Sequence, residues 1–173
     1  MTRIRAARRE DGVAIGRVHV ESWRDTYAGV LPDSMLVRMT AEAEGRKWVG
    51  AIGGNDTVLV AETEDGDIVG FGNCGAARPF GLSFTGEVYT IYVLPDYQGT
   101  GLGGRLLRAL FDELVAAGHR SAVIWVLEAN PSRFFYEAMG GRRVAERAER
   151  LWGVTLPQAA YGWDTLPPPC SPR

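Results

Sequence analysis

The most constraining feature of this 173-residue chain is an apolar segment that runs through a glycine-rich turn into an amphipathic helix. Residues 87–93 are rich in β-branched and aromatic side chains, which predicts a buried strand that Pro95 ends. The turn reads Gln98-Gly-Thr-Gly-Leu-Gly-Gly104, and apolar residues then recur at helical spacing up to Gly118. Such a turn leaves backbone N–H groups without partners at a helix N-terminus, where the helix dipole favours negative charge. The segment therefore predicts a phosphate-binding site.

Length and composition predict one domain of ordinary globular type. With 46% hydrophobic and 23% charged residues, the chain is large and apolar enough to bury its own core. We place the domain at residues 1–164 and expect residues 165–173, which include Pro167-Pro168-Pro169, to form a loose tail. The net charge of −2 argues against a nucleic-acid partner, because such proteins usually present a basic patch or stripe.

Residues that would indicate a metal site, a disulfide framework or a membrane span are sparse. Two cysteines, Cys74 and Cys170, and two histidines, His19 and His119, form no metal-binding or disulfide pattern. The N-terminus has no apolar signal core, and no apolar run approaches the roughly 18–20 residues that cross a membrane. We therefore expect a cytoplasmic protein that has no metal and no membrane partner.

The remaining patterns predict an α/β (α+β) domain with a mixed, mostly antiparallel sheet of about seven strands and about four flanking helices. The segment 87–127 reads strand–helix–strand, so it predicts one βαβ unit with a central parallel pair. Asp65-Gly66 signals a hairpin before that unit. Strands are expected at residues 3–6, 57–61, 68–76, 87–93, 121–127, 142–148 and 155–164, and helices at 10–27, 33–49, 102–117 and 131–139.

The glycine turn also matches the dinucleotide-binding pattern G-x-G-x-x-G, with Glu128 about twenty residues further on. In that fingerprint the glycines follow the strand directly and open a series of βαβ repeats. Here residues 94–98 intervene, and a hairpin precedes the strand. A simple strand-to-helix turn is the other alternative, but it does not require three glycines in the six residues 98–103. The context therefore disfavours both alternatives.

Read as Gln98-x-x-Gly101-x-Gly103, the turn resembles the R/Q-x-x-G-x-G/A motif of the GNAT N-acetyltransferase superfamily. The order of predicted elements also resembles the GNAT fold up to about Asp164. The resemblance implies acetyl-CoA as the cosubstrate, and glycines suit this role because a Cβ would hold the backbone away from the phosphates. By resemblance, the cofactor-binding residues are Ile91, Tyr92 and Val93 at the strand edge, for the pantetheine arm, and Gln98, Gly99, Thr100, Gly101, Leu102, Gly103 and Gly104 in the turn, for the pyrophosphate.

A second segment, from Leu127 to Gly141, resembles the Asn…Phe-Tyr…Gly pattern that follows the fifth strand in the same superfamily. The resemblance implies that Asn130 contacts the pantetheine amide and that Tyr136 protonates the leaving thiolate of CoA. A phenol of pKa about 10 is a reasonable donor to a thiolate of pKa about 8.5 when the two are held close. Two alternatives stay open: Asn130 also suits a helix N-cap, and Tyr136 also suits a core position beside Phe135.

Direct attack on a thioester requires a neutral amine, so some group has to accept a proton. Removing the proton of a lysine-like amine of pKa about 10.4 costs near 4.6 kcal/mol at pH 7. Glu87 is the candidate general base, because it lies among apolar residues of the central strand, a setting in which carboxylates are often tuned for catalysis. Alternatively, Glu87 binds the ammonium group of the acceptor or pairs with an arginine.

The acceptor end is expected at the N-terminal helices, which vary most within the superfamily. His19, Trp23 and Tyr27 follow one another at a spacing of four residues and therefore share a helical face. The segment 22–33 resembles a GNAT subgroup that acts on small molecules, which makes Trp23 and Tyr27 candidate substrate-binding residues. The alternative is that this aromatic face belongs to the core and that His19 is a packed helix residue.

Together these features predict an enzyme that moves the acetyl group of acetyl-CoA to the primary amine of a small-molecule acceptor by direct attack. Two alternatives stay open: a protein or peptide N-acetyltransferase, and a non-catalytic module that binds acyl-CoA. The superfamily makes a homodimer plausible, although no sequence feature of this chain establishes one.

Overall fold

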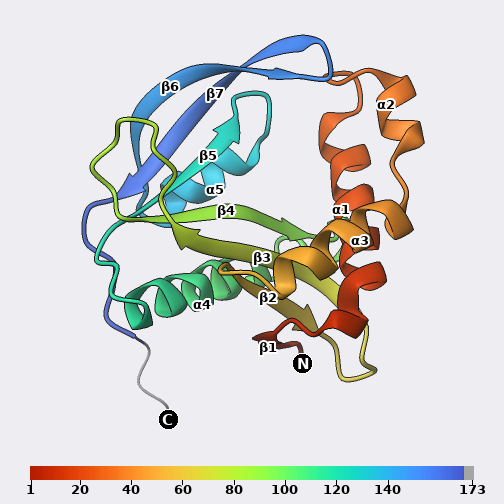
Figure 1. The fold of residues 1–173 in the computed structure, drawn as a ribbon, viewed down its shortest axis with the longest axis horizontal. Helices are drawn as coiled ribbons and strands as arrows, with labels where there is room; N and C mark the ends of the chain where they lie inside the picture. The colour runs from red at the N-terminus through yellow and green to blue at the C-terminus, as the bar shows by residue number, and fades with distance from the viewer. Residues whose placement is uncertain (170–173) are drawn as a thin grey trace.

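The computed structural model describes residues 1–169 and shows one seven-stranded sheet with helices packed on both faces (Figure 1). The strands are ordered β1-β2-β3-β4-β5-β7-β6 across the sheet, and only β4 and β5 are parallel neighbours. This confirms the predicted α/β (α+β) class and its central parallel pair. The strands are β1 (Arg3–Ala6), β2 (Thr57–Glu62), β3 (Ile68–Ala76), β4 (Gly86–Val93), β5 (Ala122–Leu127), β6 (Arg142–Leu151) and β7 (Val154–Trp163).

Five α-helices are present in residues 1–169, one more than the sequence predicted, because the helix expected over 33–49 is divided. Met39 adopts an extended conformation, and the hydroxyl of Thr40 accepts a hydrogen bond from the N–H of Ala43 at 3.2 Å, which starts a new helix. The helices are α1 (Gly12–Tyr27), α2 (Asp33–Arg38), α3 (Ala41–Ile52), α4 (Leu102–Ala116) and α5 (Ser132–Ala138), with 3-10 turns η1 (Arg9–Asp11) and η2 (Pro95–Tyr97).

The alternation of side chains along the strands divides the interior into two layers. Leu59 of β2 packs with α4, whereas its neighbours Val58 and Val60 pack on the opposite face with α1 and α3. Helix α4 buries six side chains, each worth about 1.5–3 kcal/mol of transfer free energy. This packing holds the N-terminus of α4 beside the C-terminal end of β4. The six residues are Leu102, Leu106, Leu107, Leu110, Phe111 and Leu114.

The parallel strands β4 and β5 pair only at their beginnings, with Gly86 opposite Ala122 and Glu87 opposite Val123. The pairing of β3 with β4 shifts register so that Tyr89 becomes an extra residue, and such bulges bend a strand. On its other side β5 pairs with β7 along its whole length. Among the described residues, no strand pairs with this edge of β4 after Glu87, so its backbone groups stay available to a ligand.

The final hairpin is longer than expected, because Trp152 and Gly153 both adopt positive φ and form a two-residue turn between β6 and β7. Leu166, inside the segment predicted to be a tail, is buried against the core, and its N–H donates to the carbonyl of Arg120 at 2.8 Å. The proposed boundary at Asp164 stays a prediction, and residues 170–173, with Cys170, lie outside the described part.

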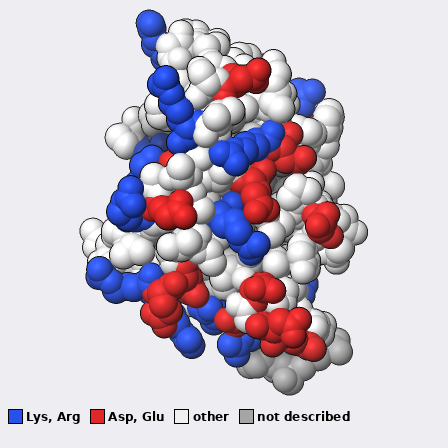
Figure 2. All heavy atoms as spheres, turned by 90° about the vertical axis from the view of Figure 1, so that its right-hand side faces the viewer, with Lys and Arg blue, Asp and Glu red and all other residues white. Residues whose placement is uncertain are grey.

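On the face formed by the N-terminal helices, acidic and basic side chains are interspersed (Figure 2). Within residues 1–169, no helix is both long enough and apolar enough to cross a membrane.

His19 of α1 is packed in this N-terminal layer rather than presented to a cleft. Its Nδ1 accepts a hydrogen bond from Nε1 of Trp48 at 3.0 Å, and its ring stacks on Tyr92 with 5.5 Å between centroids. Burial lowers the pKa of His19 to about 4, even though Glu44 acts in the opposite direction. These contacts agree with the packed alternative.

We expect acidification to destabilise the protein through His19. Because the pKa in the folded state lies below the unfolded value of about 6.5, the unfolded chain binds the proton more tightly, and stability falls as the pH drops from 6.5 toward 4. The shift corresponds to a loss of about 1–3 kcal/mol, measured as the free energy of unfolding in urea. The variant His19→Gln should flatten this dependence, whereas His119→Gln should not. Equal pH profiles for the two variants would contradict the assignment.

Candidate functional site

A cleft of about 480 Å³ lies where the C-terminal end of β4, the glycine turn and α5 come together. Eight of the eleven residues predicted to bind the cofactor line it: Ile91, Val93, Gln98, Gly99, Gly101, Gly103, Gly104 and Asn130. The other three are placed differently. Tyr92 lines a neighbouring pocket, the hydroxyl of Thr100 donates to the carbonyl of Tyr97, and the side chain of Leu102 is buried in the core. The structure therefore brings most of the predicted cofactor residues together.

The turn combines unusual backbone conformations with open space. Gly99 and Gly101 have φ of +71° and +83°, in the left-handed region that favours glycine. A Cβ added at either position would meet no protein atom within 4 Å, so a side chain there would occupy the space open to a ligand. Gly101 is the N-cap of α4 and offers no side-chain cap, so the first N–H groups of the helix are free to bind an anion.

Gln98 has a structural role in this turn. Its N–H donates to the carbonyl of Pro95 at 3.1 Å, and its side-chain Nε2 donates to the carbonyl of Val93 at 3.0 Å. The N–H of Gln98 is therefore already bonded, so the expectation that this backbone amide faces a phosphate is wrong. Gln98 instead ties the end of β4 to the turn, and the available amides begin at Gly99.

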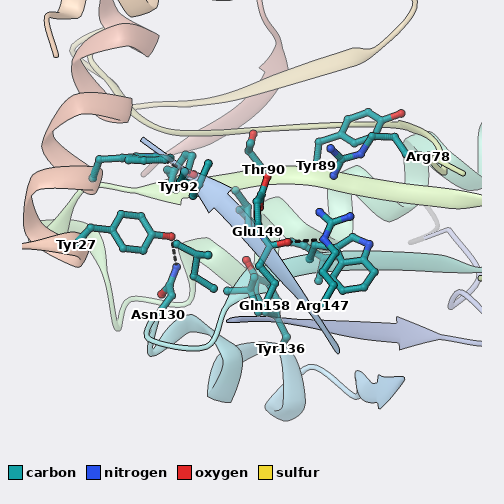
Figure 3. Close-up of a pocket in the computed structure, with 17 residues that line it drawn as sticks. Tyr27, Arg78, Tyr89, Thr90, Tyr92, Asn130, Tyr136, Arg147, Glu149 and Gln158 are labelled. Atoms are coloured by element: carbon teal, nitrogen blue, oxygen red, sulfur yellow. Dashed lines mark hydrogen bonds between the residues drawn. The ribbon is translucent and has the colours of Figure 1, made fainter. Parts of the chain in front are cut away.

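A second, smaller pocket of about 130 Å³ opens where β4 and β5 separate, and β6, β7 and α1 complete its wall (Figure 3). Ile91, Asn130 and Tyr136 line both this pocket and the cleft, so the two spaces meet at these residues. A reactive group carried in the cleft would therefore meet a molecule in the pocket beside Tyr136. We call the two spaces the cofactor cleft and the acceptor pocket.

Tyr136 of α5 stands at this junction. Its side chain is buried, and burial raises the pKa of the phenol, with a further increase from the nearby Tyr92 and Tyr27. The phenol is therefore protonated at neutral pH, as a proton donor must be. Among the described side chains, none makes a hydrogen bond to its hydroxyl, which leaves that group available to a ligand.

Trp23, Tyr27 and Asn130 form a connected wall of the acceptor pocket (Figure 3). Nδ2 of Asn130 donates to the hydroxyl of Tyr27 at 3.2 Å, and Nε1 of Trp23 donates to the hydroxyl of Tyr92 at 2.9 Å. Oδ1 of Asn130 also accepts from the N–H of Ser132 at 2.9 Å, so the residue supports the start of α5, although the N-cap itself is Pro131 and not Asn130 as the alternative predicted. Trp23 and Tyr27, the two residues predicted to bind the acceptor, thus both line this pocket, and their role stays a prediction.

Glu87 does not reach the acceptor pocket. Its side chain is completely buried, and Arg78 covers the carboxylate: Nη2 and Nε of Arg78 lie 2.6 and 2.9 Å from Oε2, and the N–H of Arg78 donates to Oε1 at 3.1 Å. Of the roles left open for Glu87, pairing with an arginine is the one that the structure contains. Arg78, and not Glu87, lines the pocket.

Three charged residues of the pocket were missed by sequence reasoning, namely Arg78, Arg147 and Glu149. The strand that carries Arg147 and Glu149 was expected to end at residue 148, whereas β6 continues to Leu151. Their alternation with the exposed Ala148 and Arg150 is a period-two pattern that marks one face of a strand. In the described part of the chain, no cluster of His, Cys, Asp or Glu is arranged to hold a metal ion.

The glycine turn at the N-terminus of α4 and the unpaired edge of β4 agree with the family that the sequence resembles. Residues 18–140 match the family described as Acetyltransferase (GNAT). This chain belongs to the GNAT acetyltransferase family. The superfamily recognised from the glycine turn is thereby confirmed.

Two relatives of this GNAT chain and one solved structure align with 79–100% of its length. It is 36% identical to the uncharacterized N-acetyltransferase YuaI of Bacillus subtilis, over 96% of this chain and 95% of YuaI. It is 32% identical to the L-amino acid N-acyltransferase MnaT of Escherichia coli, over 79% of this chain and 77% of MnaT. Among solved structures, yncA from Salmonella typhimurium, a putative acetyltransferase with acetyl-CoA bound, superposes with a TM-score of 0.71 at 26% identity, covering 100% of this chain and 98% of yncA.

Proposed function

We propose that this GNAT acetyltransferase transfers the acetyl group of acetyl-CoA to the primary amine of a small-molecule acceptor. The observation that carries the proposal is the junction at Tyr136, where an anion-binding cleft opens into a separate small pocket. Relatives support both the cosubstrate and the small acceptor: yncA was solved with acetyl-CoA, and MnaT is named for acyl transfer to L-amino acids. The pocket of about 130 Å³ is below the 300–1,000 Å³ of usual drug-sized sites, which favours a small acceptor.

The cofactor cleft has the chemistry that acetyl-CoA requires. The free N–H groups at the start of α4 suit a pyrophosphate, since the positive end of the helix dipole points at the same place. The unpaired edge of β4 from Ile91 to Val93 presents backbone donors and acceptors, which suit the two amides of a pantetheine arm in the way an added strand is bound. Bound acetyl-CoA would supply the activated acetyl group as a thioester.

At the junction, the residues of this chain would direct the reaction. The neutral amine of the acceptor attacks the thioester carbonyl carbon, so that a C–N bond forms and the C–S bond breaks. The phenol of Tyr136 gives its proton to the leaving thiolate, and the amine nitrogen loses one proton to solvent or to a carboxylate. Trp23, Tyr27 and Tyr92 form an aromatic part of the pocket wall. We assign Glu87 to holding Arg78 in place, because its buried carboxylate is already paired.

Acetyl-CoA at a hundred times its dissociation constant should stabilise the folded protein by about 2.7 kcal/mol, which raises Tm by roughly 5–11 °C. Thermal unfolding with and without acetyl-CoA measures the shift, and desulfo-CoA and adenosine serve as ligand controls. No shift with acetyl-CoA would contradict the cofactor assignment.

Release of free CoA thiol in the presence of a panel of amines tests the second half of the proposal. We expect release with small primary amines and only background release with tertiary amines, which carry no N–H to exchange. Binding without release to any acceptor would support the non-catalytic acyl-CoA module. Release with peptides alone would support a peptide N-acetyltransferase.

A further inference from the structure

Strand β6 presents three successive side chains to the acceptor pocket. Arg147, Glu149 and Leu151 line it, whereas Ala148 and Arg150 between them are exposed. Residues two apart along a strand share a face, so the three side chains follow one another along one wall. The wall therefore carries a cation, an anion and an apolar group in a set order.

Arg147 is held with part of its guanidinium group free. Its Nε donates to Oε1 of Gln158, the residue opposite it in the β6–β7 register, at 2.7 Å. Its Cζ lies 3.9 Å from the centre of the Phe80 ring and 4.1 Å from the Trp125 ring, so the flat face of the group packs on aromatic surface. In residues 1–169 no carboxylate forms an ion pair with Arg147, and its two terminal nitrogens remain as donors.

A second guanidinium group lies close to the first. Arg78 also lines the pocket, its Cζ is 5.1 Å from the same Phe80 ring, and Glu87 fixes its orientation through Nε and Nη2. Burial lowers the pKa of Arg147; the carboxylate of Glu149 raises it, and the positive charge of Arg78 lowers it. Two arginines that face one half-buried space form a site for a carboxylate, which each can bind through parallel N–H donors.

Glu149 supplies the opposite charge on the side nearer the junction. It makes no ion pair among the described residues, and it lies between Tyr27 and Arg147 in the pocket (Figure 3). Burial raises the pKa of the Tyr27 phenol, the hydrogen bond from Asn130 lowers it, and the Glu149 carboxylate raises it. Because the hydroxyl of Tyr27 bonds to Asn130 at the junction, a cation held by Glu149 would lie near the acetyl group.

We propose that the acceptor is a small α-amino acid, whose carboxylate is bound by Arg147 and Arg78 and whose ammonium group is bound by Glu149 before it loses its proton. This inference rests on the proposed function and specifies its acceptor. The negative and positive groups of the pocket match the zwitterion in order, with the amine at Glu149 toward Tyr27 and the carboxylate at Arg147 away from it (Figure 3). A peptide N-terminus has no carboxylate at that distance, so the same residues disfavour it.

Initial rates with each of the twenty L-amino acids and with the corresponding α-carboxamides test the inference. We expect kcat/KM to be tenfold to a hundredfold higher for the accepted amino acid than for its carboxamide. Arg147→Gln should remove this preference by lowering kcat/KM for the acid alone. Glu149→Gln should lower kcat/KM for both compounds, because both carry the ammonium group. The control Arg150→Gln alters the exposed face of the same strand and should change neither.

The outcomes separate the inference from the function on which it rests. Carboxamides used as well as the acids, or simple alkylamines accepted while no amino acid is, would overturn the zwitterion site and leave acetyl transfer intact. Loss of activity in Arg147→Gln toward acid and carboxamide alike, with unchanged acetyl-CoA affinity, would also overturn it. If no primary amine releases thiol from acetyl-CoA, the proposed function itself fails.

Discussion

Replacement of Tyr136 by phenylalanine is expected to lower kcat by about a hundredfold or more, while Kd for acetyl-CoA stays within about twofold. The change removes only the hydroxyl, which faces the junction of the cofactor cleft and the acceptor pocket, and keeps the ring that packs beside Phe135 at 5.3 Å between centroids. Steady-state thiol release gives kcat, and calorimetric titration gives Kd. The leaving thiolate would then have to take its proton from water, which raises the barrier of bond cleavage.

Tyr161→Phe is the matched control for Tyr136→Phe. Tyr161 is a fully buried neighbour of Tyr136, its hydroxyl bonds to Glu137 at 3.0 Å, and it lines neither space. Its replacement removes the same atom from the same layer of the core, so it reports any general cost of losing a buried phenol. Equal kcat for the wild type and Tyr136→Phe would exclude the proton-donor role and favour the core alternative that the sequence left open.

Replacement of Gly101 by glutamate is expected to weaken acetyl-CoA binding by about a hundredfold or more. The side chain would enter the space open at the turn, and its negative charge would take the place of a phosphate at the positive end of α4. A non-glycine residue at φ of +83° also costs roughly 1–2 kcal/mol in backbone strain, which lowers stability but not affinity as such. Titration of the folded variant with acetyl-CoA separates the two effects.

Gly118→Glu provides the control, because it introduces similar backbone strain at a position outside the cofactor cleft. Gly118 follows the C-terminal end of the same helix, has φ of +94° and is likewise free of neighbours around an added Cβ. It should lose similar stability and keep full affinity for acetyl-CoA. Full affinity in Gly101→Glu would remove the glycine turn from the cofactor site, whatever its effect on stability.

The cofactor half of the site was largely predictable, because its signals are local. The positive φ at Gly99 and Gly101, the start of α4 and the preceding strand all lie within a few residues of one another, and each leaves a mark in the sequence. The same holds for Tyr136 in its short segment after β5. Two local expectations were wrong because a nearby residue formed a different hydrogen bond. Thr40 caps and starts a new helix, and the carbonyl of Pro95 accepts a hydrogen bond from the N–H of Gln98.

The acceptor half depended on contacts that no local pattern records. Glu87 appeared as a lone carboxylate in a strand, and only the return of the loop at Arg78 shows that it is paired. Arg147 and Glu149 were unremarkable in a chain with many charges, because their importance comes from the register of β6 with β7 and from the separation of β5 from β4.

By itself, the sequence determined the family, the order of most elements and the glycine turn at the start of α4, since strand alternation, helix periodicity and glycine turns depend on near neighbours. Tertiary structure alone decided which charges enter the acceptor pocket. Arg147 and Glu149 lie 69 and 71 residues after Arg78 in the sequence. They line the same pocket because the sheet order places β7 beside β5 and β6 beside β7. The interaction energies of these charged side chains depend on their distances and on their burial in the folded molecule, and both are properties of the whole fold.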